Sequence, residues 1–235
     1  MEKKKFKMGL LIFAAFLPIV VQALFNLKPV VEKNSFYLMF WMLANYLFIG
    51  ALIDMFVGYM AILSLRGLKI NRSIYYLNLF IYTVFLIFVN TYFIQFIYVR
   101  DNAIINSIAS VPTALIILTC FVVNLLSAAF PTKKDLDSSI VYKISKSNPI
   151  KFGKDKFSTA IGSFDEGMVF GNIIVFYKDL KSIYTDKDKE LVIKGKGFSK
   201  NYLISIDTPK SRAKAIEIIK MARDLGKIEK KKVNL

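Results

Sequence analysis

The sequence holds few residues suited to chemistry, and the most conspicuous is a carboxylate inside an apolar stretch. Asp54 lies in LFIGALIDMFVGYM, residues 47–60, and is the only charged residue between Lys33 and Arg66. Ionisable groups in membrane-spanning segments are costly, and they commonly serve proton relays, ion sites or interhelical bonds. Two interpretations of Asp54 therefore stay open: a proton or cation site, or a structural bond between helices.

Other reactive groups are scarce. The chain has no histidine and one cysteine, Cys120, which excludes an intrachain disulfide, a Cys/His zinc site and Ser-His-Asp or Cys-His catalysis. Cys120 lies in an apolar run, as a packed thiol would. The sequence therefore predicts a protein that is not an enzyme, with no catalytic, cofactor-binding or metal-binding residues.

Composition divides the chain into two blocks. More than half of the 235 residues are hydrophobic, which is typical of a membrane protein. Residues 1–130 contain 10 Lys and Arg and 4 Asp and Glu, whereas residues 131–235 contain 23 and 13. The first block is predicted to be a transmembrane helical domain, residues 1–131, and the second a basic, water-soluble domain.

Four apolar runs can each span a bilayer, which takes about 20 residues. They are predicted as four transmembrane helices near residues 8–25, 36–63, 74–99 and 109–130. The first run follows four lysines and precedes Val21-Gln22-Ala23, so cleavage of residues 1–23 as a signal peptide is an alternative.

Lysine and arginine in the loops indicate the orientation. The amino terminus, the loop SLRGLKINRS at residues 64–73 and the segment after residue 130 are basic, and the intervening loops are less so. The positive-inside rule then predicts a multi-pass protein of the cell membrane with both termini cytoplasmic.

Polar residues in the apolar runs are predicted to form two layers. Their depths along the predicted spans place one set nearer the inner side of the membrane and the other set nearer the outer side. The inner set is Asp54, Asn124, Tyr82 and Asn78, and the outer set is Asn45, Asn90 and Gln22. In the structural interpretation, Asp54 bonds to Asn124 or Tyr82 and fixes the helix register.

Small residues flank Asp54 on one helical face. Gly50, Asp54 and Gly58 are spaced by four residues, and small side chains allow a neighbouring helix to approach closely. This spacing predicts that Asp54 lies at a helix contact and faces away from lipid.

The second block has the pattern of short strands followed by one helix. Residues 132–139 are predicted as a linker, residues 140–226 as a small α+β domain, and residues 227–235 as a basic tail. Strands are expected at 140–145, around FSTAI and GMVF, and at 172–185, 190–197 and 201–207. A closing amphipathic helix follows, capped by Asp207 or Thr208, started by Pro209 and ended by Gly226.

A resemblance extends this interpretation. The segment from NIIVFYKDLKSIYT to IEIIKMARDL resembles the carboxy-terminal half of a PH-like domain, in particular that of uncharacterised prokaryotic membrane-anchored PH-like proteins. The resemblance rests on the step Phe176-Tyr177-Lys178-Asp179-Leu180, the meander strands and the final helix, and it implies a sheet or barrel closed by that helix. It implies a membrane-tethered recognition module and transfers no ligand-binding residue.

Basic residues surround the predicted soluble domain and point to its partners. Those expected to face lipid are Lys133, Lys134, Lys151, Lys154, Lys156, Lys230, Lys231 and Lys232. Near anionic lipids, each surface lysine contributes about 1 kcal/mol of attraction. The expected partners are the lipid bilayer, anionic headgroups, and a protein or second copy of the chain, with no nucleic acid. The leading hypothesis is a non-enzymatic tether or recognition module, and the alternative is a small transporter or channel that uses Asp54.

Overall fold

The computed structural model describes residues 2–99, 103–127, 132–135, 138–144, 160–197 and 200–235. Side chains of residues 2–7, 105, 120–127 and 132–135 are outside this description. The chain divides into a helical unit, residues 1–57 and 77–123, and a second unit, residues 58–76 and 124–235. We call the second one the C-terminal unit; it includes the end of helix α2, the following loop and the start of helix α3.

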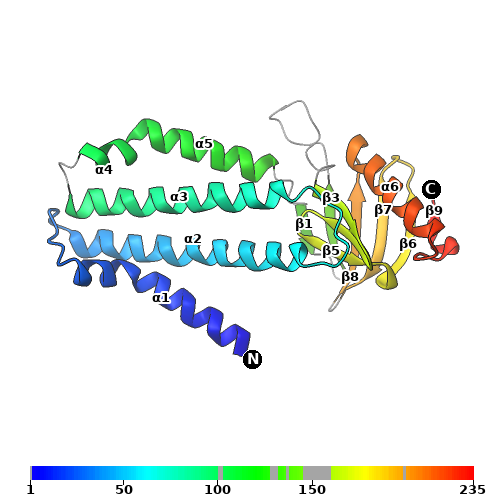
Figure 1. The fold of residues 1–235 in the computed structure, drawn as a ribbon, viewed down its shortest axis with the longest axis horizontal. Helices are drawn as coiled ribbons and strands as arrows, with labels where there is room; N and C mark the ends of the chain where they lie inside the picture. The colour runs from blue at the N-terminus through cyan, green and yellow to red at the C-terminus, as the bar shows by residue number, and fades with distance from the viewer. Residues whose placement is uncertain (1, 100–102, 128–131, 136–137, 145–159, 198–199) are drawn as a thin grey trace. The chain divides into compact units, whose positions relative to one another are not determined.

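The helical unit is built from apolar helices (Figure 1). The helices are α1 (Glu2–Leu24), α2 (Asn34–Leu63), α3 (Ser73–Tyr98), α4 (Ala103–Ile108) and α5 (Val111–Ser127). Among the described residues, α2 and α3 are long and apolar enough to cross a membrane, which gives weak support to membrane association. The apolar stretch Met8–Leu24 of α1 is shorter, and α5 has 17 residues. Membrane crossing by α1 and α5 therefore stays a prediction.

Exposed apolar side chains cover these helices. Phe13, Val57, Phe80 and Ile116 are each at least 60% exposed. Such surface is unusual in a water-soluble protein, whereas a lipid-facing helix has no need to bury it. At one end of the unit, Trp41 and Ile97 form a buried cluster, and Val30 N–H donates to the Ile97 carbonyl at 2.8 Å.

The C-terminal unit combines two sheets and a helix in one core. A mixed six-stranded sheet has the order β1-β2-β8-β7-β6-β9, and a three-stranded antiparallel sheet has the order β3-β4-β5. The strands are β1 (Thr132–Asp135), β2 (Ser139–Ile144), β3 (Ile161–Phe164), β4 (Gly167–Phe170), β5 (Ile173–Phe176), β6 (Leu180–Thr185), β7 (Leu191–Lys196), β8 (Asn201–Ile206) and β9 (Val233–Asn234). Helix α6 (Pro209–Asp224) follows them, and two short 3-10 helices are η2 (Tyr177–Asp179) and η3 (Lys230–Lys232).

The core explains why these elements form. Met168 and Phe170 of β4, Ile193 of β7 and Ile219 of α6 are fully buried in one apolar cluster. Burial of each such side chain contributes about 1.5–3 kcal/mol of hydrophobic free energy. The α6 residues spaced by three and four, from Ala215 to Ala222, form the apolar face that the sequence predicts.

Three sequence expectations differ from the structure. The predicted linker, residues 132–139, is wrong in part because Thr132–Asp135 form β1, which pairs antiparallel with β2. The predicted strand at 172–185 is interrupted by η2, since the chain turns there from the three-stranded to the six-stranded sheet. The basic tail, residues 227–235, belongs to the fold: Ile228 is 2% exposed and β9 pairs in parallel with β6.

The ends of α6 agree with the sequence. Thr208 is the N-cap residue, and Gly226 has φ +71°, a conformation that glycine adopts readily and that ends the helix. The Thr208 side chain makes no capping bond to α6 and instead donates to the Ile144 carbonyl at 3.4 Å. Thr208 therefore ties the start of α6 to the end of β2.

Candidate functional site: the hairpin seam and its pocket

The loop between α2 and α3 adds to the edge of the three-stranded sheet. Lys69 N–H donates to the Ser163 carbonyl at 2.7 Å, and Ser163 N–H donates back to the Lys69 carbonyl at 3.3 Å. Asp165 N–H also donates to the Arg66 carbonyl, at 3.1 Å. We call this contact, between residues 66–70 and residues 162–165, the hairpin seam.

Local sequence explains the close approach at the seam. A Cβ added at Gly162 would lie 2.6 Å from the Lys69 carbonyl oxygen and 2.7 Å from the Ile70 Cβ. Only glycine leaves room for the loop at that position. Gly67 has φ +68°, and an added Cβ there would collide with the Asp165 carboxylate. Gly67 thus supplies both the turn and the space for that carboxylate.

A second bond anchors the start of α3 to the same sheet. The Tyr75 hydroxyl donates to the Gly171 carbonyl at 2.7 Å, and Tyr75 is 2% exposed. The Tyr59 ring of α2 packs edge-on against Tyr75, with ring centroids 4.9 Å apart. The end of α2 and the start of α3 therefore each contribute a buried ring to the C-terminal unit.

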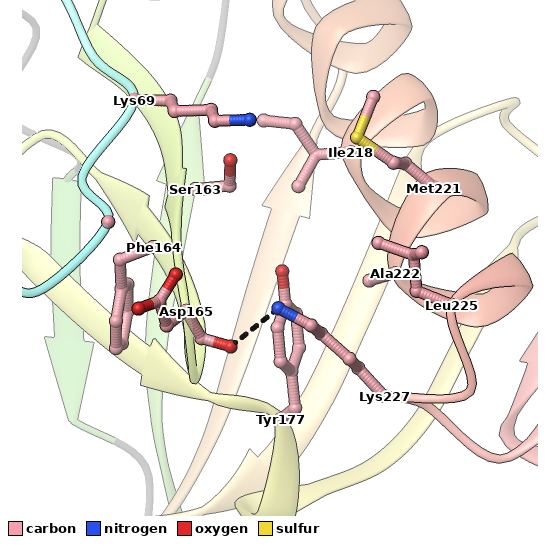
Figure 2. Close-up of a pocket in the computed structure, with 11 residues that line it drawn as sticks. Lys69, Ser163, Phe164, Asp165, Tyr177, Ile218, Met221, Ala222, Leu225 and Lys227 are labelled. Atoms are coloured by element: carbon pink, nitrogen blue, oxygen red, sulfur yellow. Dashed lines mark hydrogen bonds between the residues drawn. The ribbon is translucent and has the colours of Figure 1, made fainter.

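A pocket of about 80 Å³ opens beside the seam (Figure 2). Its walls come from the α2–α3 loop, the β3–β4 turn, η2 and the carboxy-terminal end of α6. The lining residues are Gly67, Lys69, Ser163, Phe164, Asp165, Tyr177, Ile218, Met221, Ala222, Leu225 and Lys227.

Polar groups of the pocket converge on its interior. Figure 2 shows the Lys69 side chain, the Ser163 hydroxyl and the Tyr177 hydroxyl directed into the space between β3 and α6. Tyr177 is 7% exposed, and burial raises the pKa of its phenol, so the hydroxyl remains a donor at neutral pH. The Lys227 ammonium donates to the Asp165 carbonyl at 2.9 Å across the pocket. The arrangement offers two cations and two hydroxyl donors to a bound anion.

A polar network lies on the six-stranded sheet. Glu190 accepts hydrogen bonds from the Ser205 hydroxyl and, at 3.1 Å, from the Lys143 ammonium. These bonds, first Ser205 and then Lys143, lower the pKa of Glu190 below its ordinary value of 4.5. The network joins β2, β8 and the turn before β7.

The predicted intramembrane residues occupy varied environments. Asp54 is exposed on α2, which differs from the predicted placement at a helix contact. Asn78 and Tyr82 are buried, Gln22 is half-buried, and the Asn124 side chain lies outside the described residues, so the bond from Asp54 to Asn124 or Tyr82 stays a prediction.

The predicted outer layer contains one satisfied amide and one unsatisfied amide. Asn90 accepts from the Trp41 indole at 2.8 Å. Asn45 is fully buried, and neither its amide nitrogen nor its oxygen has a hydrogen-bond partner among the residues that the structure describes. The structure therefore pairs Asn90 with Trp41, which is not one of the predicted members of its layer.

The glycines that flank Asp54 differ from one another. A Cβ added at Gly50 would lie 3.1 Å from the Leu11 side chain, which places Gly50 against α1. A Cβ at Gly58 would meet nothing within 4 Å, so the predicted helix contact is absent there within the part of the chain that the structure describes. The close contact of this face therefore lies one turn before Asp54.

The predicted lipid-facing lysines are only partly described. Lys133 and Lys134 lie in β1 with side chains outside the description, and Lys151, Lys154 and Lys156 lie outside the described residues. In the tail, Lys230 is exposed, whereas Lys231 and Lys232 pair with Glu229 at 2.9 and 3.0 Å. Part of the tail's charge is thus offset within the tail.

No known family, curated protein or solved structure matches this chain.

The pocket residues were not recognised in the sequence, where Lys69 serves only as a marker of orientation. A local signal exists: Leu68 and Ile70 alternate with Lys69 and Asn71, which is the period of a strand. Tyr177, within the step that suggests a PH-like fold, supplies one pocket hydroxyl.

Proposed function

We propose that this chain is a multi-pass membrane protein with four transmembrane helices, cytoplasmic termini and a PH-like C-terminal domain. That domain acts as a non-enzymatic recognition module, which binds a protein or the inner membrane surface. The hairpin seam is the observation that supports this proposal most directly. Because the loop between two apolar helices forms backbone hydrogen bonds with β3, the domain is held where α2 and α3 leave the bilayer.

The architecture supports the PH-like assignment. Two sheets share one core, and a single amphipathic helix follows the last long strand and covers that core. The closing helix, in particular, is the feature that the resemblance implies.

Charge supports the orientation. The α2–α3 loop carries Arg66, Lys69 and Arg72, all exposed, and the described surface of the C-terminal unit carries many more lysines. Basic loops of this kind favour the cytoplasmic side and attract anionic lipids.

Photocrosslinking in native membranes tests the proposal. A photoreactive residue is placed at exposed positions of the C-terminal unit, one at a time: Lys178, Lys194 and Lys220. The expected result is a discrete protein or lipid adduct at one face and none at the others. Uniform adducts at every position, or a carboxy terminus that a reporter fusion places outside the cell, would overturn the proposal.

A small transporter that uses Asp54 is the second candidate. The buried amide of Asn45, which has no hydrogen-bond partner among the described residues, favours it, because polar groups inside a membrane are costly and often functional. Proton or solute flux in liposomes that disappears in Asp54→Asn, with folding intact, would replace the recognition proposal by this one.

A further inference from the structure

Exposed apolar side chains gather at the mouth of the pocket. In residues 138–144, 160–197 and 200–235, the exposed large hydrophobics are Met221 at 52%, Leu225 at 67% and Leu235 at 43%. Met221 and Leu225 are one turn apart on α6, and both line the pocket. Exposed apolar surface around a pocket is a common mark of a binding site.

The same pocket is positively charged. Lys69 and Lys227 enter from two different segments, and Arg66 lies beside the turn (Figure 2 shows the first two). The pocket also contains the Asp165 carboxylate, which lies 3.8 Å from Arg66 and against Gly67. Arg66 offsets that negative charge, so the two lysines leave an excess of positive charge for a ligand.

The volume suits a small anionic group. A buried water needs about 10–15 Å³ by the same measure, so a pocket of about 80 Å³ has room for roughly five or more waters. A tetrahedral phosphate group is of this size. The Ser163 and Tyr177 hydroxyls can donate to its oxygens while the ammonium groups balance its charge.

The position along the chain favours a lipid as the source of that group. Gly67 follows Leu63, the last residue of α2, by four residues, which span at most about 14 Å. If α2 crosses the bilayer, as the proposed function requires, the pocket lies within reach of the headgroup layer. An apolar rim beside a cationic interior matches an amphiphile better than a free ion.

We propose that this pocket binds the phosphate group of an anionic phospholipid. Lys69 and Lys227 contact the phosphate, Tyr177 and Ser163 donate hydrogen bonds to it, and Met221 and Leu225 contact the adjacent apolar part of the lipid. This inference rests on the proposed function, and it names the ligand class and the site through which the domain would recognise the membrane.

The test uses the full chain in nanodiscs of neutral phosphatidylcholine with increasing fractions of phosphatidylglycerol. Lipid retained by the protein is measured by native mass spectrometry, and protection of residues 163–167 and 218–227 is measured by hydrogen exchange. In Lys69→Met with Lys227→Met, the phosphatidylglycerol fraction for half-maximal protection should rise about tenfold or more, because two charged hydrogen bonds are lost. The matched control, Lys187→Met with Lys210→Met, removes the same charge from exposed positions outside the pocket. It should change the phosphatidylglycerol fraction for half-maximal protection little.

A second variant distinguishes loss of lipid binding from misfolding. Tyr177→Phe keeps the buried ring and removes only the hydroxyl, so it should weaken retention several-fold while β7 amides stay protected. Equal losses in the pocket and control variants, or unchanged retention in Tyr177→Phe and the double variant, would overturn the proposal. So would protection by inorganic phosphate or an acidic peptide in neutral nanodiscs without any effect of phosphatidylglycerol. If the pocket fails these tests but photocrosslinks form at one other face of the C-terminal unit, only the lipid site is rejected, and the proposed recognition function is still supported.

Discussion

Substitution of Gly162 by alanine should open the hairpin seam. The new Cβ would lie 2.6 Å from the Lys69 carbonyl oxygen, a distance that non-bonded atoms do not tolerate, and the obstacle is backbone. We expect the α2–α3 loop to move away from β3 while the rest of the C-terminal unit stays folded.

The size of the effect follows from the bonds that are lost. Three backbone hydrogen bonds form the seam, with donors Lys69, Ser163 and Asp165. Each is worth about 0.5–1.5 kcal/mol net, so loss of all three costs about 2–4 kcal/mol. At 1.4 kcal/mol for each factor of ten, the open state should become roughly 30-fold to several hundred-fold more populated.

Hydrogen exchange of the full chain in nanodiscs measures this opening. The three donor amides should exchange faster by that factor in Gly162→Ala, whereas the Ile193 amide of β7 should keep its protection. Gly58→Ala is the control, because a Cβ there meets nothing within 4 Å. Unchanged protection at the seam in Gly162→Ala, or equal loss in both variants, would show that Gly162 does not control the approach of the α2–α3 loop.

Three further predictions concern single side chains. Tyr75→Phe leaves the Gly171 carbonyl unpaired and should destabilise the C-terminal unit by about 1–3 kcal/mol in denaturant unfolding. The Ser205 and Lys143 bonds lower the pKa of Glu190, so they stabilise the fold above pH 4.5, and this stabilisation is lost as the pH falls through the lower folded-state pKa. In Glu190→Gln, the free energy of unfolding should therefore fall less between pH 6 and pH 3 than in the wild type. Asn45→Leu removes a buried amide that has no partner among the described residues, and it should raise the melting temperature of the helical unit. Asn90→Leu breaks the bond to Trp41 and should lower that temperature. A lower melting temperature in Asn45→Leu would indicate a polar partner for this amide.

Local patterns in the sequence predict the regular elements well. The apolar runs at 36–63 and 74–99 differ by at most two residues at each end from α2 and α3, because hydropathy over a long run needs no tertiary information. Strands β7 and β8 and helix α6 follow from alternation and capping for the same reason.

Contacts between distant segments were not predictable in this way. The seam joins Lys69 to Ser163, 94 positions apart, and nothing in either segment specifies its partner. Lysine-rich residues 227–235 have the composition of a solvated tail, yet Ile228 and Val233 hold them on the sheet. The pocket forms only where the α2–α3 loop, the β3–β4 turn, η2 and the end of α6 meet. Its residues could therefore be recognised only in the folded chain.

In the proposed function, the α2–α3 loop holds the C-terminal domain at the membrane, and a disulfide across the hairpin seam tests this contact most directly. Lys69 and Ser163 exchange both backbone hydrogen bonds, and such antiparallel pairs have Cα atoms about 5.5 Å apart, within disulfide range. In a Cys120→Ser background, Lys69→Cys with Ser163→Cys should therefore form an intrachain disulfide in native membranes under mild oxidation. Lys69→Cys with Lys187→Cys, in the β6–β7 turn, should not. A disulfide in both pairs, or in neither, would show that the α2–α3 loop and β3 do not form the hairpin seam.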